Sequence, residues 1–364
     1  MKITIFVSYT FPYIGNGIGN IAIEQGEKLA DLGHEVTIVS SNFPKTKKEF
    51  IKNKVKHIKL SAIYILEKIN VPVPLYLFNY KIIKLIKLSD VIHVHDAIYP
   101  SSFLAALIGK FFNKPIILTQ HIPFVVYPNI LINIIQKFAY LTFGKIAFLL
   151  SDKIIIYNPE VKKMINSDEK VCFIPNGVDL SLFYPDKGND KMFYRKKYDL
   201  PIDKKIVLFV GRLVPKKGYK LLFGARDNRY LILFVGNGKV PEYMEIAKNV
   251  RFLPAMKQEE LSEIYRLSNI FALPSHSEGF PLAIQEAMAC GLPVITTKCN
   301  IFDKSIDFIK TIDLNTKSIK KATLELINDN NLITKMGLDS REFAVKNYSW
   351  HKNVSALEEI YKIL

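Results

Sequence analysis

Short apolar runs alternate with longer segments of helical spacing along the whole chain. The runs cover residues 3–7, 35–40, 91–95, 116–118 and 153–157, and then residues 206–210, 231–235, 270–273 and 293–297. Strands that alternate with helices form parallel sheets, because each crossover helix returns the chain to the same end of the sheet. The pattern predicts an α/β protein with two Rossmann-like domains, one for each set of runs.

A polar stretch separates the two sets of strands. Residues 181–205 are rich in lysine, aspartate, tyrosine and proline. The chain has 364 residues, which is more than a single hydrophobic core usually supports. We therefore expect an N-terminal domain over residues 1–180, a linker over 181–205, a C-terminal domain over 206–346 and a final helix over 347–364.

Two glutamates, Glu278 and Glu286, lie eight positions apart on either side of a proline. On one unbroken helix, at roughly 100° per residue, they would point about 80° apart and would not both face one small ligand. Pro281 fits the first position of a helix, which places Glu278 in the preceding loop and Glu286 about a turn and a half inside. The free N–H groups at residues 280–283 would then form an anion site at the helix N-terminus. The simpler interpretation is a surface glutamate and a helix-face glutamate that are unrelated.

Arg212 and Lys217 follow the apolar run at residues 206–210, after the glycine turn at Gly211. The guanidinium of Arg212 offers a planar fork for phosphate oxygens, and Lys217 adds a mobile point charge. Fixed cations of this kind can neutralise a leaving diphosphate without a metal ion. Taken alone, the two residues would more often be solvated surface charges.

These segments occur in an order that resembles glycosyltransferase family 4, a group of retaining nucleotide-sugar transferases with the GT-B fold. The resemblance also rests on the glycine loop Gly15-Asn16-Gly17-Ile18-Gly19 and on Asn176-Gly177-Val178-Asp179 at the end of the first set of strands. It covers nearly the whole chain. It implies that the two Rossmann-like domains face a central cleft and that the C-terminal helix returns to the N-terminal domain.

The resemblance also implies roles for individual residues. The donor-binding residues would be Gly17, Arg212, Lys217, Met256, Glu278, Gly279, Phe280, Pro281, Leu282 and Glu286. Within this set, Arg212 and Lys217 would hold the diphosphate, and Glu286 would bind the ribose hydroxyls. Glu278 would bind the transferred sugar, and it is expected to be catalytic together with His121. Met256 lies where family members contact the nucleobase, and it does not distinguish one base from another.

His121 follows the apolar run at residues 116–118, a place where a histidine is often only a satisfied polar residue. His93, His95 and Asp96 invite a metal interpretation, because alternation along a strand puts the two histidines on one face. Family 4 enzymes generally need no divalent cation, and the neighbouring sequence offers no third and fourth ligands, so we expect no metal. The glycines at 15, 17 and 19 lack the spacing of a dinucleotide-binding loop. We expect no cofactor, with the nucleotide sugar as co-substrate.

The chain is strongly basic, with a formal net charge of +16 and an isoelectric point near 9.4. Such a charge fits nucleic acid, an anionic membrane surface or an anionic substrate as partner. Lysines 81, 84 and 87 recur at a spacing of three among apolar residues, which is typical either of a surface-binding helix or of a helix packed on its own sheet. With the lysines of residues 45–59 in the same domain, the pattern indicates peripheral membrane contact.

The sequence predicts a cytoplasmic protein, in peripheral contact with the inner face of the membrane. The longest apolar stretch, residues 130–150, is interrupted by Asn133, Gln136, Lys137 and Lys145, so no transmembrane helix is expected. The first run begins within two residues of Met1, which leaves no room for a cleavable leader. The three cysteines show no metal spacing, which is typical of a reducing compartment.

The expected function is a metal-independent, retaining glycosyltransferase of glycan biosynthesis. It would move a hexose-type sugar from a nucleotide diphosphate sugar to a glycan or lipid-linked acceptor. The alternatives are a nucleotide-sugar epimerase of the same fold and a basic nucleic-acid-binding protein without catalysis. The chain has no recognisable RNA or DNA motif, so we expect no nucleic-acid partner.

Overall fold

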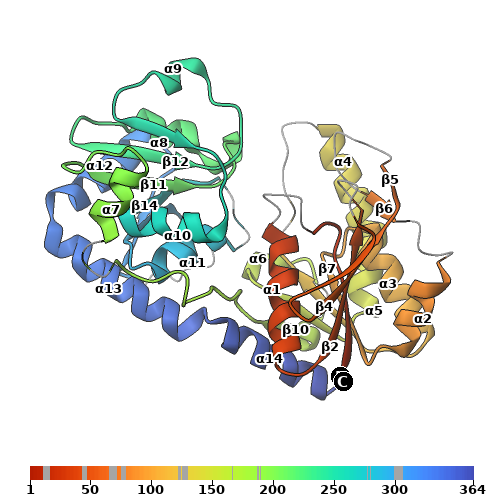
Figure 1. Ribbon diagram of the computed structural model, residues 1–364. Helices are drawn as coiled ribbons and strands as arrows, with labels where there is room; N and C mark the ends of the chain where they lie inside the picture. The colour runs from red at the N-terminus through yellow and green to blue at the C-terminus, as the bar shows by residue number, and fades with distance from the viewer. Residues whose placement is uncertain are drawn as a thin grey trace. The chain divides into compact units, whose positions relative to one another are not determined.

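The computed structural model divides the chain into two compact units, Met1–Asn176 with Trp350–Leu364, and Gly177–Ser349 (Figure 1). The structure describes all residues except 11–16, 43–46, 65–71, 75–78, 122–123, 125–129, 166, 187, 189, 277, 279 and 299–305. The first boundary falls at residues 176 and 177, where the sequence predicted 180.

The first unit is built on an eight-stranded sheet. Its strands are β1 (Lys2–Phe6), β2 (Glu35–Ser41), β3 (Glu49–Lys52), β4 (Val55–Leu60), β7 (Val91–His95), β8 (Ile116–Gln120), β9 (Lys153–Ile156) and β10 (Val171–Phe173). They lie in the order β10-β9-β8-β7-β1-β2-β4-β3, and only β3 runs antiparallel to its neighbour. Every residue of β7 and β8 is buried, because helices cover both faces of a parallel sheet. A separate antiparallel pair joins β5 (Ala62–Tyr64) to β6 (Pro72–Pro74).

The helices of the first unit include the last helix of the chain. They are α1 (Gly17–Asp31), α2 (Tyr80–Leu88), α3 (Pro100–Phe111), α4 (Ile130–Ala139), the π-helical η1 (Tyr140–Gly144), α5 (Lys145–Leu150), α6 (Pro159–Lys162), the 3-10 turn η2 (Asp168–Lys170) and α14 (Trp350–Lys362). Helix α14 lies beside α1, where Gln25 Nε2 donates to Asn353 Oδ1 at 3.3 Å (Figure 1). The expected return of the C-terminal helix to the N-terminal domain is confirmed.

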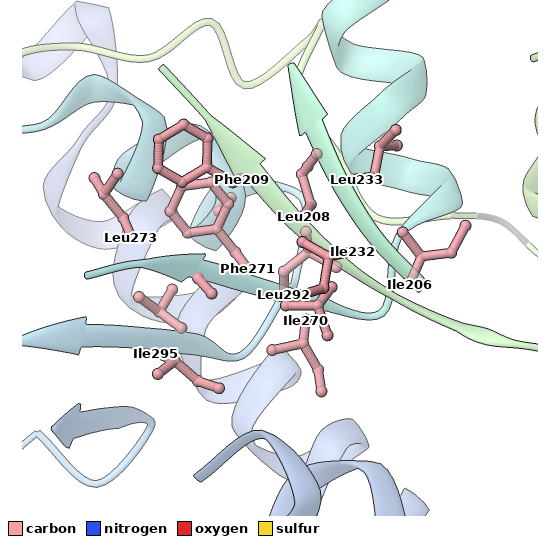
Figure 2. Packing of buried hydrophobic residues seen from close by; sticks show 14 of the residues in the cluster. Ile206, Leu208, Phe209, Ile232, Leu233, Ile270, Phe271, Leu273, Leu292 and Ile295 are labelled. Carbon is pink, nitrogen blue, oxygen red and sulfur yellow. The ribbon is translucent and has the colours of Figure 1, made fainter. Parts of the chain in front are cut away.

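The second unit contains a six-stranded parallel sheet in the order β13-β12-β11-β14-β15-β16. The strands are β11 (Lys205–Val210), β12 (Tyr230–Val235), β13 (Val250–Leu253), β14 (Ile270–Leu273), β15 (Val294–Thr297) and β16 (Ile309–Ile312). The helices are α7 (Asp190–Lys197), the 3-10 turn η3 (Pro215–Lys217), α8 (Tyr219–Gly224), α9 (Glu242–Glu245), α10 (Gln258–Leu267), α11 (Leu282–Ala289), α12 (Thr316–Asn328) and α13 (Asn330–Asn347). Phe209, Leu233, Phe271 and Ile295 come from four neighbouring strands and pack in one apolar cluster (Figure 2).

Residues 181–205, which we expected to be a linker, form part of the second unit. Helix α7 packs against α10, and the buried guanidinium of Arg195 holds this contact together. Its Nη1 donates to the carbonyl of Lys204 at 2.9 Å, and its Nη2 donates to Asn269 Oδ1 at 2.7 Å. The polar composition of the segment therefore reflects one solvated helix face and a satisfied buried arginine.

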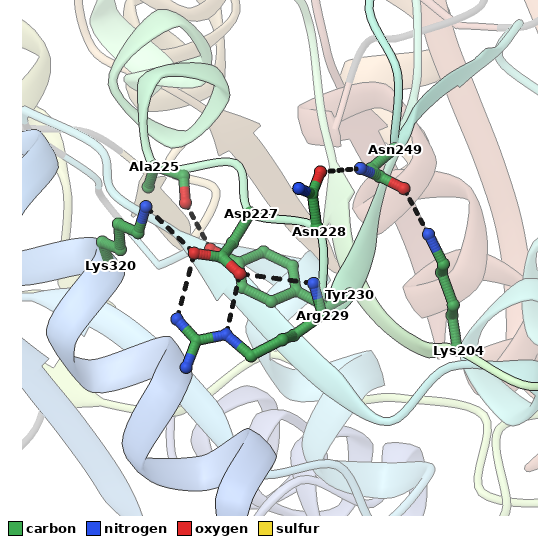
Figure 3. Close-up of polar contacts among 8 residues, drawn as sticks. All are labelled: Lys204, Ala225, Asp227, Asn228, Arg229, Tyr230, Asn249 and Lys320. Carbon is green, nitrogen blue, oxygen red and sulfur yellow. Dashed lines mark hydrogen bonds and ion pairs between the residues drawn. The ribbon is translucent and has the colours of Figure 1, made fainter.

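Polar contacts fix the amino ends of the strands in the second unit (Figure 3). Asp227 accepts from Arg229 Nε at 2.8 Å and from Lys320 Nζ at 3.0 Å, so the turn before β12 is tied to α12. The Arg229 guanidinium holds the pKa of the Asp227 carboxyl well below its usual range. Lys204 Nζ donates to Asn249 Oδ1 at 2.5 Å, which joins the turns before β11 and β13. The opposite, carboxyl ends of these strands carry the candidate site.

Candidate nucleotide-sugar site

The loops after β11 and β12 pack backbone against backbone. Gly211 N donates to Val235 O at 3.0 Å, and Leu213 N donates to Asn237 O at 2.8 Å. Gly236 has a φ of +149°, and a Cβ added there would lie 2.0 Å from the carbonyl oxygen of Gly211. Only glycine permits this approach. The segment that carries Arg212 is therefore fixed at the carboxyl end of a parallel sheet, where ligands of such folds bind.

Lys217 and Glu278, which come from two separate motifs, form an ion pair. Lys217 Nζ lies 2.7 Å from Glu278 Oε1 and 2.9 Å from Oε2. The two side chains are only 19% and 9% exposed. Gly218 fixes the approach, because its φ is +68° and a Cβ there would lie 1.8 Å from Pro274 O. His276 N also donates to Lys216 O at 2.8 Å, so the turn η3 and the loop after β14 form one rigid corner.

Positive charge collects at this corner. Burial lowers the pKa of Lys216, and the nearby Lys217 and Arg212 charges lower it further, while Glu278 raises it. Two further cations and one carboxylate therefore lie within electrostatic reach of Lys216. Arg212 is exposed, and its side chain forms no hydrogen bond or ion pair with any residue that the structure describes. The corner can accept a polyanion such as a diphosphate, with the Arg212 fork ready to bind its oxygens.

Glu286 lies inside α11 and is held by a tyrosine. Tyr265 Oη donates to Glu286 Oε2 at 2.8 Å and to Ala283 O at 3.2 Å. Burial raises the pKa of Glu286 to about 7, and the hydrogen bond from Tyr265 opposes this shift. The sequence offered no sign of this contact, since Tyr265 belongs to α10 and resembles an ordinary core residue. An acidic group with such a pKa can accept ribose hydroxyls as a carboxylate or donate one hydrogen bond as an acid.

The remaining donor residues line the start of α11 and the end of β13. Helix α11 begins at Leu282, and Pro281 is its N-cap. The sequence predicted Pro281 one position later, as the first residue of the helix. Phe280 packs edge-to-face on Tyr348, with ring centroids 5.7 Å apart, and this contact anchors the loop. Met256 is half-buried against the core of the unit. Gly279 lies outside the described residues.

A row of buried histidines lies at the carboxyl ends of β7 and β8 in the first unit. His95 Nδ1 and His121 Nε2 are 2.8 Å apart, and His93 Nδ1 lies 2.7 Å from Tyr361 Oη on α14. The His93 and His95 rings stack with centroids 4.7 Å apart, and the His95 and His121 rings at 5.1 Å. Burial lowers the pKa of His93 and of His121 to about 3, so both are neutral near pH 7. Among the residues that the structure describes, no three His, Cys, Asp or Glu side chains, these histidines included, are arranged so that they could hold a metal ion.

Asp96 stands at the end of this row with one unpaired oxygen. Its backbone has a φ of +59°, and its Oδ1 accepts from His121 N at 2.8 Å. Burial raises the pKa of Asp96 to about 7. Asp96 Oδ2 and His95 Nε2 are shielded from solvent and make no hydrogen bond to a described residue. Such atoms carry a free-energy cost, which a ligand can offset. The sequence placed Asp96 at a strand end and gave no sign of the unpaired oxygen.

Gly17 begins α1 in the first unit. Apart from its chain neighbours and the backbone of its own helix, no described residue has an atom within 4 Å of the position that a Cβ would occupy there.

Known protein families match both halves of the chain. The model described as Glycosyltransferase Family 4 matches residues 15–182, and the model described as Glycosyl transferases group 1 matches residues 190–343. An uncharacterized glycosyltransferase of Methanocaldococcus jannaschii is 30% identical over 381 residues, covering 100% of this chain and 99% of that protein. The chain belongs to glycosyltransferase family 4.

Solved structures share the fold of this glycosyltransferase. Sucrose-phosphate synthase from Thermosynechococcus elongatus matches with a TM-score of 0.76 at 20% identity, covering 99% of this chain and 98% of that chain. The HepE protein of Anabaena, in complex with UDP and glucose, matches with a TM-score of 0.77 at 15% identity, covering 100% of both chains. The predicted GT-B fold is confirmed.

The lysine-rich helix α2 of this glycosyltransferase buries its apolar face. Ile82 and Ile86 are fully buried in the core of the first unit, and Lys81 Nζ lies 3.2 Å from Glu49 Oε1 at the surface. The helix thus packs on its own sheet with its lysines in water. Its sequence allowed this arrangement as the alternative to a membrane-binding helix. No helix among the described residues combines the length and apolar composition needed to cross a membrane.

Proposed function

We propose that this glycosyltransferase moves a hexose-type sugar from a nucleoside diphosphate sugar to a hydroxyl group of a glycan or lipid-linked acceptor, with retention at the anomeric carbon. The partly buried Lys217–Glu278 pair beside Arg212 is the observation that carries the proposal. Cations that suit a diphosphate and a carboxylate that suits a sugar hydroxyl occur together at one corner of the second unit, which supports a nucleotide-sugar donor. UDP and glucose in the complex of the HepE protein support the same class of ligand.

The donor contacts follow from the charges at this corner. Arg212 and Lys217 bind the diphosphate oxygens, and Glu286, oriented by Tyr265, accepts the ribose hydroxyls. The first N–H groups of α11 face the same anion, because a helix N-terminus leaves them without intrahelical partners. In the structure Lys217 is paired with Glu278. On donor binding, Lys217 turns toward phosphate while Glu278 accepts a hydrogen bond from the sugar.

The chemical step separates the sugar from a diphosphate and forms an oxocarbenium-like state. The cations of the corner stabilise the leaving diphosphate, which takes the proton of the incoming hydroxyl on the same face of the sugar. These cations supply the charge that a divalent ion provides in other transferases, so we propose turnover without added metal. His121 is neutral and its Nε2 is paired with His95, so its Nδ1 is the ring nitrogen that forms a hydrogen bond with a sugar hydroxyl, which can both donate and accept.

The direct test is a titration with UDP-, GDP- and ADP-sugars in the presence of a chelator, followed by melting temperature. A ligand that binds only the folded state raises the melting temperature by mass action. We expect the sugars of one nucleotide to raise the melting temperature, which would identify the base that the protein binds. Stabilisation by a short nucleic acid alone would refute the proposal. If the protein epimerises the donor sugar and transfers it to no acceptor, the function is that of the epimerase alternative.

The basic chain also supports peripheral contact with an anionic membrane from the cytoplasmic side. Helix α2 does not offer an apolar face for that contact, so another surface of the first unit must supply it.

A further inference from the structure

Helix α4 and the turn η1 expose a stripe of large apolar side chains. We call this stripe the α4 apolar face, and it consists of Ile130, Leu131, Ile134, Ile135, Phe138 and Leu141. These side chains are between 39% and 76% exposed. Ile146 and Leu149 continue the exposed apolar surface along α5. Single exposed apolar residues are ordinary, whereas a contiguous stripe of this length marks an interaction surface.

The polarity of α4 is inverted relative to an ordinary surface helix. At about 100° per residue from Ile130, the exposed apolar residues of α4 centre near 70°, whereas Asn133 and Gln136 of α4 and Tyr140 of η1 centre near 270°. The polar side thus turns toward the protein while the apolar side meets water, although surface helices normally do the reverse. Gln136 Oε1 and Tyr140 Oη are shielded from solvent and lack a hydrogen-bond partner among the residues that the structure describes.

On this polar side, Tyr140 at the start of η1 lies near Asp96, which stands at the end of the row of buried histidines. Burial raises the pKa of Tyr140, and the charge of Asp96 raises it further, so the two residues lie within electrostatic reach of each other. The His121 amide donates to the same Asp96 carboxylate. The segment therefore exposes its apolar face, while Tyr140 Oη is shielded from solvent within electrostatic reach of Asp96.

We propose that the α4 apolar face binds the interfacial region of an anionic lipid bilayer and holds the His121 end of the first unit against it. The charges favour a bilayer over a second copy of this chain. Residues 130–150 contain no acidic residue, and both lysines of the segment, Lys137 and Lys145, are exposed. Lysines beside an apolar face attract anionic headgroups, while two identical faces would bring like charges together. That the bilayer would present a lipid-linked acceptor to the His121 end of the unit rests on the proposed function.

The test compares two triple variants that each replace three exposed apolar residues by glutamine. Leu131→Gln, Ile134→Gln and Phe138→Gln remove the centre of the face, whereas Ile51→Gln, Ile246→Gln and Leu338→Gln remove scattered apolar residues that are at least as exposed. Binding is measured by flotation with vesicles of phosphatidylglycerol and phosphatidylcholine. We expect the first variant to lose at least about tenfold in partition and the control to retain it. Melting temperature and donor binding, measured on both variants, show that each is folded.

A second pair of measurements separates lipid from other occupants. Replacing Lys137 and Lys145 by glutamine should weaken binding to the anionic vesicles and abolish the dependence of that binding on salt. Ile134→Trp should show a blue-shifted emission on vesicles, against the constant background of the buried Trp350.

Equal partition of the two triple variants, or an unshifted Ile134→Trp emission, would overturn the proposal. So would a wild-type dimer in light scattering that the α4 variant alone dissociates, since a second copy would then cover the face. These results are independent of donor binding. Vesicle binding without any nucleotide binding would refute the proposed function and leave the surface assignment standing.

Discussion

The raised pKa of Glu286 predicts that donor affinity depends on pH. If only the carboxylate accepts both ribose hydroxyls, protonation competes with binding. With a pKa of about 7 in the empty protein, the affinity at pH 6 should be about tenfold lower than at pH 8. Binding near pH 7 should also release part of a proton, because hydrogen bonds from hydroxyl groups favour the ionised form.

Glu286→Gln should remove this dependence. Loss of a charged hydrogen-bond acceptor costs about 1.5–3 kcal/mol, so affinity at pH 8 should fall by roughly 10- to 150-fold and become flat with pH. The assay is calorimetric titration with the nucleotide sugar in two buffers of different ionisation enthalpy. The intact sugar diphosphate is preferable to the free nucleotide, whose terminal phosphate titrates near the same pH. The matched control is Glu259→Gln, a substitution at an exposed glutamate of α10.

The same variant should be more stable than the wild type when no donor is bound. Folding raises the pKa of Glu286 above its ordinary value of 4.5. The folded state therefore binds the proton more tightly, and this group makes the protein less stable as the pH rises from about 4.5 to about 7. Glutamine keeps an acceptor for Tyr265 and carries no charge, so its melting temperature at pH 8 should exceed that of the wild type. Wild-type affinity that is flat from pH 6 to pH 8, or a Gln variant of lower melting temperature, would refute the reasoning.

Three further substitutions test the remaining parts of the site. Arg212→Ala should weaken donor binding by about 2–5 kcal/mol in a titration while the melting temperature stays unchanged, since the side chain is exposed. Lys217→Gln and Glu278→Gln should be strongly non-additive in a double-mutant cycle on melting temperature, because each alone leaves a mostly buried charge unpaired. Gly218→Ala should cost more than about 3 kcal/mol in denaturant unfolding, since its Cβ would strike Pro274 O, whereas Gly33→Ala at a similar positive φ with open space should cost about 1 kcal/mol.

Except for β4, whose sequence Val-Lys-His-Ile-Lys-Leu is not an apolar run, the interior strands of both sheets could be predicted from the sequence, and the edge strands could not. Strands such as β7 and β14 are buried on both faces and therefore appear as continuous apolar runs. The edge strands β3, β10, β13 and β16 are short and partly exposed, and a charged residue interrupts each of them except β10, which has only three residues. The prediction that residues 181–205 form a linker was wrong for a related reason. Its composition is polar, yet one buried arginine, Arg195, binds it into the second unit.

The candidate site could be predicted as a set of motifs, but its contacts could not. The pairing of Lys217 with Glu278 joins residues 61 positions apart, and it depends on how the loops after β11 and β14 pack through Gly218. The hydrogen bond from Tyr265 to Glu286 depends on the packing of α10 against α11. In the sequence, helix α4 is only an interrupted apolar stretch, because the structure is needed to show that Gln136 Oε1 is shielded from solvent while the apolar side chains are exposed.

Each unit keeps one carboxyl group in an environment that disfavours its charge. Asp96 lies at the end of β7 and Glu286 lies in α11, and burial raises the pKa of both to about 7. Near neutral pH each group lowers the stability of the empty protein, since ionising it in place costs more than in water. Folding alone would favour asparagine and glutamine at these positions. Sugar hydroxyls would supply the missing hydrogen-bond donors, so the free energy lost in the empty protein would reappear as affinity and as orientation of the substrates.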